Sequence, residues 1–172
     1  SQDGTIKNAV KLHDGLTVES VLIPTATRTT ACVSSQVGCS LNCEFCATAR
    51  LKRMRNLLPD EIYDQVVAID NESRLYNNMP LSNIVFMGMG EPFLNYSNTI
   101  KACEILCDNK AFNFGTRRIT ISTSGILPKI EQYIKEKHRF KLAISLNASN
   151  NDLRNKIIPI NKKWNIEDIL SA

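Results

Sequence analysis

The sequence of 172 residues lacks the features that mark non-globular and membrane proteins. It has only 7 Gly and 6 Pro, which excludes collagen-like, low-complexity and wholly disordered chains. No apolar run approaches the roughly 18 to 20 residues of a membrane span. The first residues also lack the basic start and apolar stretch of a secretory signal. We therefore expect a cytoplasmic protein that does not contact a membrane.

An excess of one charge is missing as well. Lys and Arg number 21 against 17 Asp and Glu, a formal net charge of +4. This excess is too small to indicate a nucleic-acid partner by itself, but it is compatible with one if the positive charge is clustered. One cluster is the segment 50–55 (RLKRMR), for which a solvated surface and RNA phosphate contacts both stay open. The length fits one domain of roughly 100 to 200 residues.

The cysteines are the unusual feature of the composition. There are six, and three of them, Cys39, Cys43 and Cys46, lie within GCSLNCEFC. A disulfide scaffold is disfavoured, because the chain shows no export signal and is long enough to form a core. A structural zinc ion needs four ligands, one more than this motif supplies. In an iron-sulfur cubane, three cysteines bind three irons and leave the fourth iron open, so the spacing favours an iron-sulfur cluster.

The hydrophobic pattern predicts an α/β fold. Residues 5–12 and 16–23 alternate apolar with polar around Asp14-Gly15, which predicts a β-hairpin with a tight primed turn. Short apolar strands at 29–34, 83–87, 118–122 and 140–146 then alternate with helical patterns. We expect four parallel βα units, an open half-barrel with its functional loops at the carboxyl ends of the strands. The expected division is a hairpin at 1–27 and a truncated core at 28–172.

Five motifs follow one another in the order of these units: ACVSSQVGCSLNCEFCATA, FMGMGEP, RRITISTSG, AISLNA and IIPINKKWNIE. Together they resemble the RlmN-like RNA adenine C2 methyltransferases of the radical S-adenosylmethionine (SAM) superfamily, over nearly all of residues 3–172. The resemblance implies a partial (βα) radical-SAM barrel, a [4Fe-4S] cluster and SAM. It also implies methyl transfer to C2 of an adenosine in 23S rRNA, tRNA or both.

The same resemblance implies the partners and leaves two alternatives. The partners would be RNA and a flavodoxin- or ferredoxin-type electron donor, with a monomeric protein when the chain is full length. C8-methylating antibiotic-resistance relatives share much of the pattern and remain an alternative. The other alternative is an iron-sulfur binding module without methyltransferase activity.

Carried over position by position, the resemblance implies two sets of cofactor-binding residues. The cluster ligands would be Cys39, Cys43 and Cys46, and the SAM contacts would be Gly90, Glu91, Ser122, Leu146, Asn147 and Ala148. The last motif departs from the frequent SLHA form of the family. Asn147 keeps hydrogen-bonding capacity but cannot titrate near neutral pH, which puts an acid-base role at this position in doubt.

The resemblance also implies two catalytic residues outside these sets, Cys32 and Glu19. In the family a second, C-terminal cysteine carries the methyl group; the Cys32-type thiol resolves the protein-RNA adduct, and the two cysteines end in a disulfide bond. Glu19 matches an acidic residue that accepts a proton. No cysteine follows Cys107 in these 172 residues. We therefore expect the natural chain to continue past Ala172 and to supply the second cysteine.

Overall fold

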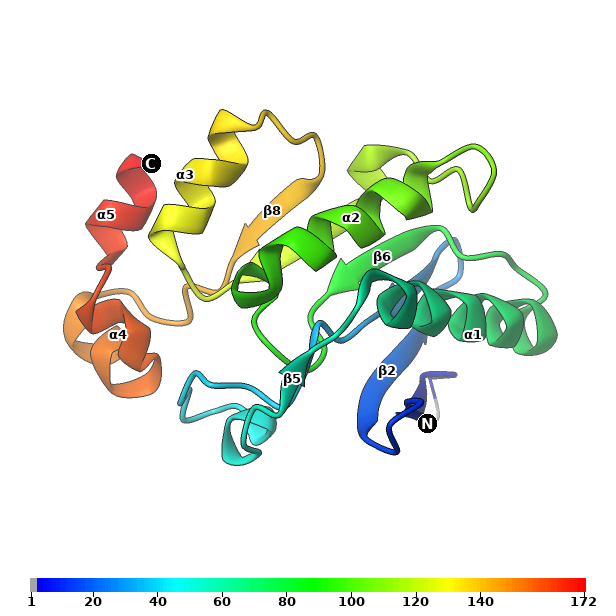
Figure 1. Ribbon diagram of the computed structural model, residues 1–172, viewed down its shortest axis with the longest axis horizontal. Coiled ribbons are helices and arrows are strands. Elements are labelled where there is room, and N and C mark those ends of the chain that lie inside the picture. Colours follow the sequence, from blue (N-terminus) through cyan, green and yellow to red (C-terminus); the bar gives the residue numbers. More distant parts are fainter. Residues whose placement is uncertain (1–2) are drawn as a thin grey trace.

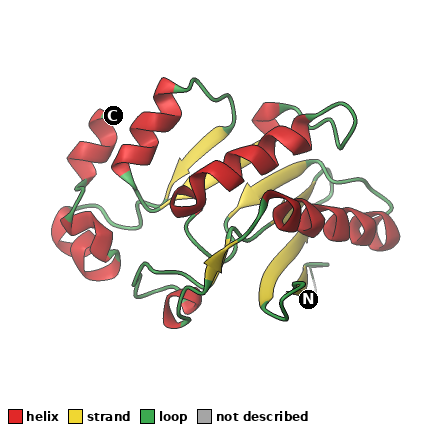
Figure 2. Cartoon of the chain, viewed as in Figure 1, coloured by secondary structure: helices red, strands yellow, loops and turns green. Residues whose placement is uncertain are grey.

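The computed structural model describes residues 3–172 and is built on one six-stranded sheet in the order β1-β2-β3-β6-β7-β8 (Figure 1). Its strands are β1 Ile6–Lys11, β2 Thr17–Pro24, β3 Thr29–Cys32, β6 Asn83–Phe86, β7 Ile119–Thr123 and β8 Lys141–Ile144. The helices are α1 Pro59–Asn77, α2 Tyr96–Cys107, α3 Leu127–Lys135, α4 Asn151–Ile157 and α5 Ile166–Ser171. Helices α1 and α2 lie side by side across the sheet (Figure 2).

The N-terminal hairpin is present, but its turn differs from the expected one. Gly15 has a positive φ of +83°, whereas Asp14 does not, so the turn is not a two-residue primed turn. The Gly15 N–H donates to the Leu12 carbonyl at 3.0 Å, and the Leu12 N–H donates to the Leu16 carbonyl at 2.7 Å. These bonds close a longer loop that places glycine at its one left-handed position.

The four parallel strands expected from the sequence are confirmed. β3 pairs with β6, β6 with β7 and β7 with β8, all parallel, and Phe86 lies opposite Ile121 in the register. Parallel neighbours need crossover connections, and α1, α2 and α3 supply them. β2 pairs antiparallel with β3, so the hairpin extends the same sheet. The division between residues 27 and 28 stays a prediction.

The core lies between the sheet and its helices. Ile62, Val66 and Ile69 recur along α1 at spacings of four and three, and all three are fully buried. Ile84 and Ile121 from β6 and β7 are fully buried in the same cluster. Burial of each such side chain contributes about 1.5 to 3 kcal/mol. No helix within residues 3–172 is long and apolar enough to span a bilayer.

A second, two-stranded sheet of β4 Gln36–Val37 and β5 Arg55–Asn56 closes the loop that carries the three cysteines. The sequence did not predict it. Gly38, with φ +75°, lies where the two arms of the loop meet, and a Cβ there would lie 2.2 Å from the Lys52 carbonyl oxygen. Only glycine fits this position. The close approach therefore fixes where the cysteine loop starts and ends.

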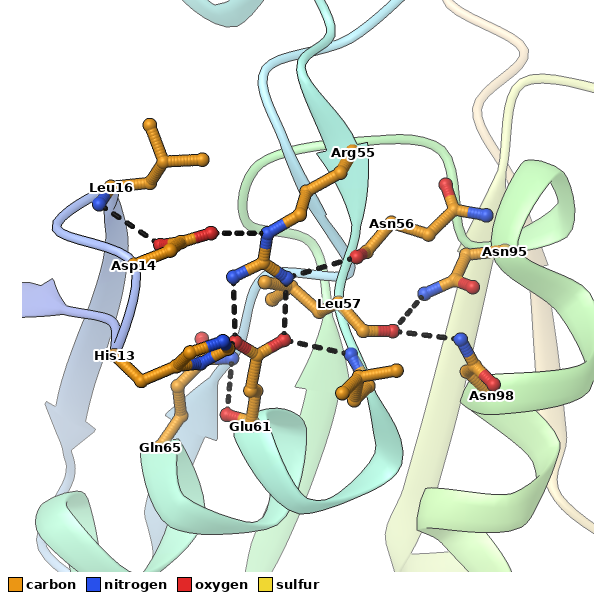
Figure 3. Close-up of polar contacts among 11 residues, drawn as sticks. His13, Asp14, Leu16, Arg55, Asn56, Leu57, Glu61, Gln65, Asn95 and Asn98 are labelled. Atoms are coloured by element: carbon orange, nitrogen blue, oxygen red, sulfur yellow. Dashed lines mark hydrogen bonds and ion pairs between the residues drawn. The ribbon is translucent and has the colours of Figure 1, made fainter.

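Arg55 joins this small sheet to two other elements (Figure 3). Its Nη1 and Nη2 donate to the two carboxylate oxygens of Glu61 at 2.7 Å each, and its Nε donates to Asp14 Oδ2 at 2.6 Å. Glu61 also accepts the Leu58 N–H at the start of α1, at 2.9 Å. The hairpin turn, β5 and the first turn of α1 are thus held by one bidentate guanidinium.

The Arg55 contacts divide the basic segment 50–55. Three of its four cations, Arg50, Lys52 and Arg53, are exposed and remain available to a phosphate backbone. Arg55 is committed to two carboxylates and is not available. Charge counting along the sequence could not separate these two roles, because the acidic partners of Arg55 lie elsewhere in the chain.

We expect Arg55→Met to lower the free energy of unfolding by about 2 kcal/mol, because it leaves the buried Glu61 carboxylate without its cation. The matched control is Arg53→Met, which removes an exposed cation two residues away and should change stability by less than about 0.5 kcal/mol. Chemical denaturation of both variants measures the difference. Equal stability of the two variants would contradict the assigned role of Arg55.

The same contacts predict a dependence of stability on pH. Hydrogen bonds from Arg55 lower the pKa of Glu61 and also lower the pKa of Asp14. A carboxyl whose pKa is lowered by folding stabilises the protein above its unfolded pKa, about 4.3 for Glu, and this contribution disappears as the pH falls through the folded pKa. Thermal unfolding should therefore show an acid loss below about pH 4.3 that is smaller in Arg55→Met. An identical acid profile in both proteins would refute this linkage.

Candidate cofactor site

A cavity of about 590 Å³ opens at the carboxyl ends of β6, β7 and β8. Eight residues expected at a site line it: Cys39, Cys43, Cys46, Gly90, Glu91, Ser122, Leu146 and Asn147. They come from four separate stretches of the chain. The parallel strands bring these stretches together, because their carboxyl ends lie at one edge of the sheet.

The cysteine loop is shaped by its own backbone and by a contact with α4. The Leu41 N–H donates to Cys39 Sγ at 3.4 Å, and the Cys46 N–H donates to the Cys43 carbonyl at 3.1 Å. The Glu44 N–H donates to the carbonyl of Ile157 at the end of α4, at 3.0 Å. These contacts direct the loop over the cavity, and an N–H aimed at a sulfur favours the thiolate form that metal ligands need.

The chemistry of the three thiols fits a metal cluster. Burial raises the pKa of the Cys43 thiol to about 11 and also raises the pKa of Cys39. Without a cation, both thiols are therefore protonated at neutral pH. Metal binding releases these protons, since the positive charge of the metal offsets the burial of the thiolate.

The arrangement differs from that of a single-ion site. Within the described residues, no three His, Cys, Asp or Glu side chains converge on one point that could hold a metal ion. A zinc site needs such convergence. Cys39, Cys43 and Cys46 do share the lining of one cavity, and three thiols around one space fit a cubane in which each cysteine binds a different iron.

Glu91 is the buried acid of the cavity, with 3% of its surface exposed. Its carboxylate accepts the Phe93 N–H at 3.0 Å and, at 2.8 and 2.5 Å, the backbone N–H and the hydroxyl of Ser124. The Glu91 N–H in turn donates to Gln36 Oε1 at 2.9 Å. A carboxylate has about four acceptor sites, so capacity remains for a cation of a ligand.

Gly90 and Gln36 explain why the chain turns as it does beside Glu91. Gly90 has φ +95°, and a Cβ there would lie 2.5 Å from Gln36 Cβ. Gln36 is fully buried. Neither Gln36 nor Ser124 was expected from the sequence, because their roles depend on contacts with residues far along the chain.

The loops after β7 and β8 form the opposite wall of the cavity. The hydroxyls of Ser122 and Ser145 lie 3.1 Å apart and are within hydrogen-bonding distance. Asn147 is exposed and has a left-handed φ of +57°. Asn and His are both enriched in this conformation, which gives a structural reason why Asn can stand where the family often has His.

Three of the expected site residues lie outside the lining of the cavity. Ala148 is half-buried in the loop after β8. Cys32 is buried at the end of β3, where burial raises the pKa of its thiol and the backbone of Met87 hydrogen-bonds to it. The Glu19 carboxylate is about half exposed and lies 2.7 Å from Lys7 Nζ. The roles of these residues stay predictions.

All six cysteines are free thiols. Cys103 is fully buried in the core, and Cys107, one turn further along α2, is half-buried against the same core. The disulfide expected between Cys32 and a further, C-terminal cysteine stays a prediction, because Cys32 is a free thiol in this structure.

Comparison with known proteins gives several matches. A probable dual-specificity RNA methyltransferase RlmN from Christiangramia forsetii is 63% identical over 172 residues, which span 49% of that protein. A dual-specificity RNA methyltransferase RlmN from Geotalea uraniireducens is 46% identical over 172 residues, 48% of its length. The chain thus spans about half the length of the curated relatives it matches.

A solved structure and a family model agree with these matches. The crystal structure of a radical SAM methyltransferase from Sphaerobacter thermophilus has a TM-score of 0.95 and 45% identity, covering 99% of this chain and 50% of that one. Residues 33–172 match the model of the radical SAM superfamily. The cofactors this implies, a [4Fe-4S] cluster and SAM, fit a cavity lined by three thiols and a buried carboxylate. The chain belongs to the radical SAM superfamily.

Proposed function

We propose that this chain carries the cluster-binding and SAM-binding part of an RNA methyltransferase that acts on C2 of adenosine in 23S rRNA, tRNA or both. The single observation that carries this proposal is the cavity that joins three cysteines to a buried carboxylate and to the loops after β7 and β8. The names of the relatives support RNA as the substrate. A flavodoxin- or ferredoxin-type donor, a cytoplasmic location and a monomeric state belong to the same proposal.

In this proposal different parts of the cavity bind the cluster and the different groups of SAM. Cys39, Cys43 and Cys46 hold the cluster, and Glu91, with Gly90 giving space for the backbone, receives the ammonium group of SAM. The ribose and adenine of SAM lie against Ser122 and the stretch 146–148. Cluster and SAM supply one-electron chemistry, which is needed because C2 of adenine is electron-poor and cannot attack the SAM methyl group directly.

Two residues outside the lining of the cavity complete the assignment. Cys32 is the thiol that resolves the protein-RNA adduct, and its closeness to Met87, which lines the cavity, supports this role. Glu19 accepts a proton. In the described structure Glu19 pairs with Lys7, so this role requires the ion pair to open when RNA binds.

RNA would approach over the cysteine loop. The exposed cations Arg50, Lys52 and Arg53 follow the three cysteines in the chain, and Phe45 and Met54 expose 58% and 62% of their surface in the same region. Cations give salt-dependent contacts to phosphates, and an exposed ring gives a surface on which a base can stack.

An electron-transfer module that never cleaves SAM is the competing function. Such a module needs a cluster but not a second binding surface. Here the buried Glu91 and the paired Ser122 and Ser145 hydroxyls extend the cavity well beyond the cysteines. This extension favours the methyltransferase.

We expect Cys43→Ala to lose the full cubane, because only two thiolates of the site remain. The matched control is Cys107→Ala, which removes a half-buried thiol from α2 and should keep the cluster. Anaerobic reconstitution followed by iron and sulfide analysis tests both. A full cubane in Cys43→Ala would rule out the ligand assignment.

The function is tested by following the fate of SAM. The reduced, reconstituted 172-residue chain should cleave SAM to methionine and 5′-deoxyadenosine, and Glu91→Gln should weaken SAM binding in calorimetric titration. It should not form 2-methyladenosine in unmodified RNA, because Cys32 alone cannot be both methyl carrier and resolving thiol. Absence of SAM cleavage in a cluster-loaded chain would favour the electron-transfer module. Catalytic 2-methyladenosine formation would refute the two-cysteine assignment.

A further inference from the structure

The guanidinium of Arg154 on α4 is fully buried without a carboxylate partner. Its donors reach neutral oxygens: Asn161 Oδ1 at 2.6 Å, the Ser124 carbonyl at 2.6 Å, the Leu146 carbonyl at 3.1 Å and the Ser145 carbonyl at 3.3 Å. No ion pair found among residues 3–172 includes it. A buried charge without a counter-charge is strongly unfavourable, so a negative group is expected nearby.

The position of Arg154 points to the cavity. Ser124, Ser145 and Leu146, whose carbonyls it holds, all line the cavity, so the guanidinium lies directly behind that wall. The end of its helix, α4, receives the hydrogen bond from Glu44 in the cysteine loop. Arg154 is thus bound to one wall, and its helix contacts the loop that carries the three thiols.

Burial also sets the electrostatic cost at Arg154. It lowers the pKa of the guanidinium, which means that the charged form is disfavoured where it lies. A negative group on the other side of the wall that Arg154 holds would offset this cost.

We propose that Arg154 is the internal counter-charge of the cluster held by Cys39, Cys43 and Cys46, a positioning residue that also ties the loops after β7 and β8 to α4. This inference rests on the proposed function. Three thiolates carry more negative charge than an oxidised cubane core carries positive charge, and reduction adds one more electron. A fixed cation behind the wall favours the reduced state and so raises the reduction potential of the cluster.

A purely structural role for Arg154 makes a different prediction, and two variants separate the roles. Asn161→Asp places a carboxylate on the Arg154 guanidinium and cancels its field while keeping the acceptor for Arg154 Nη1. It also removes the Asn161 Nδ2 donor to Asn151 and Asn155, a loss that the thermal unfolding of this variant measures. Arg154→Lys keeps the charge but cannot serve all the acceptors. The matched control is Lys156→Met, which removes an exposed cation from the same helix.

The test is a redox titration of the reconstituted 172-residue chain without SAM, followed optically, alongside thermal unfolding of each variant. In Asn161→Asp we expect cluster reduction to become about tenfold less favourable, a shift of about 59 mV to lower potential. Arg154→Lys should keep the wild-type potential and lose thermal stability, and Lys156→Met should change neither.

An unchanged reduction potential in Asn161→Asp would overturn the proposal, whatever the potential of Arg154→Lys. A normal potential with weaker SAM binding in Asn161→Asp would assign the charge to the carboxylate of SAM and would also overturn it. If Asn161→Asp does not fold, Arg154→Gln, which removes the charge, replaces it: we expect a lowered potential in Arg154→Gln, and a wild-type potential there would overturn the proposal. A wild-type chain that binds no cluster would refute the proposed function itself.

Discussion

The common direction of β3, β6, β7 and β8 is the constraint on which the candidate site depends. Because the four strands are parallel, the loops at their carboxyl ends meet at one edge of the sheet. The Glu91 carboxylate then ties two of these loops together through Ser124. A shift of one residue in any strand register would turn the inward side chains outward and separate these groups.

Two buried side chains of opposite charge, Glu91 and Arg154, lie at the cavity. Glu91 places a buried negative charge in the wall of the cavity, and Arg154 places a buried positive charge behind it; both bind Ser124, the first at its N–H and hydroxyl and the second at its carbonyl. Neither charge has an oppositely charged side chain as partner among the described contacts. Buried charges without a partner of opposite charge are unfavourable, so we expect charged groups of the bound cofactors to lie near each of them.

Sequence patterns predicted those parts of the molecule that depend on local chemistry. The spacing of Cys39, Cys43 and Cys46 predicted one shared site, and the three thiols do line one cavity, while their role as cluster ligands stays a prediction. Apolar periodicity predicted α1 and the parallel strands. The contacts of Arg55 and Arg154 were not predictable, because their partners are chosen by the folded chain. Arg55 and Asp14 are 41 residues apart, and Arg154 and Ser124 are 30 apart. The left-handed backbone conformation of Asn147 was not predictable either, because the φ angle of a single residue produces no periodic pattern in the sequence.

The central claim is that SAM binds in the cavity in direct contact with the cluster held by the three cysteines. Electron-nuclear double resonance on the reduced, reconstituted chain tests this claim most directly, with SAM isotopically labelled in the amino and carboxylate groups of its methionine part. We predict hyperfine coupling between both labels and the cluster. A reduced cluster that shows no coupling to either label while SAM is bound would contradict the account.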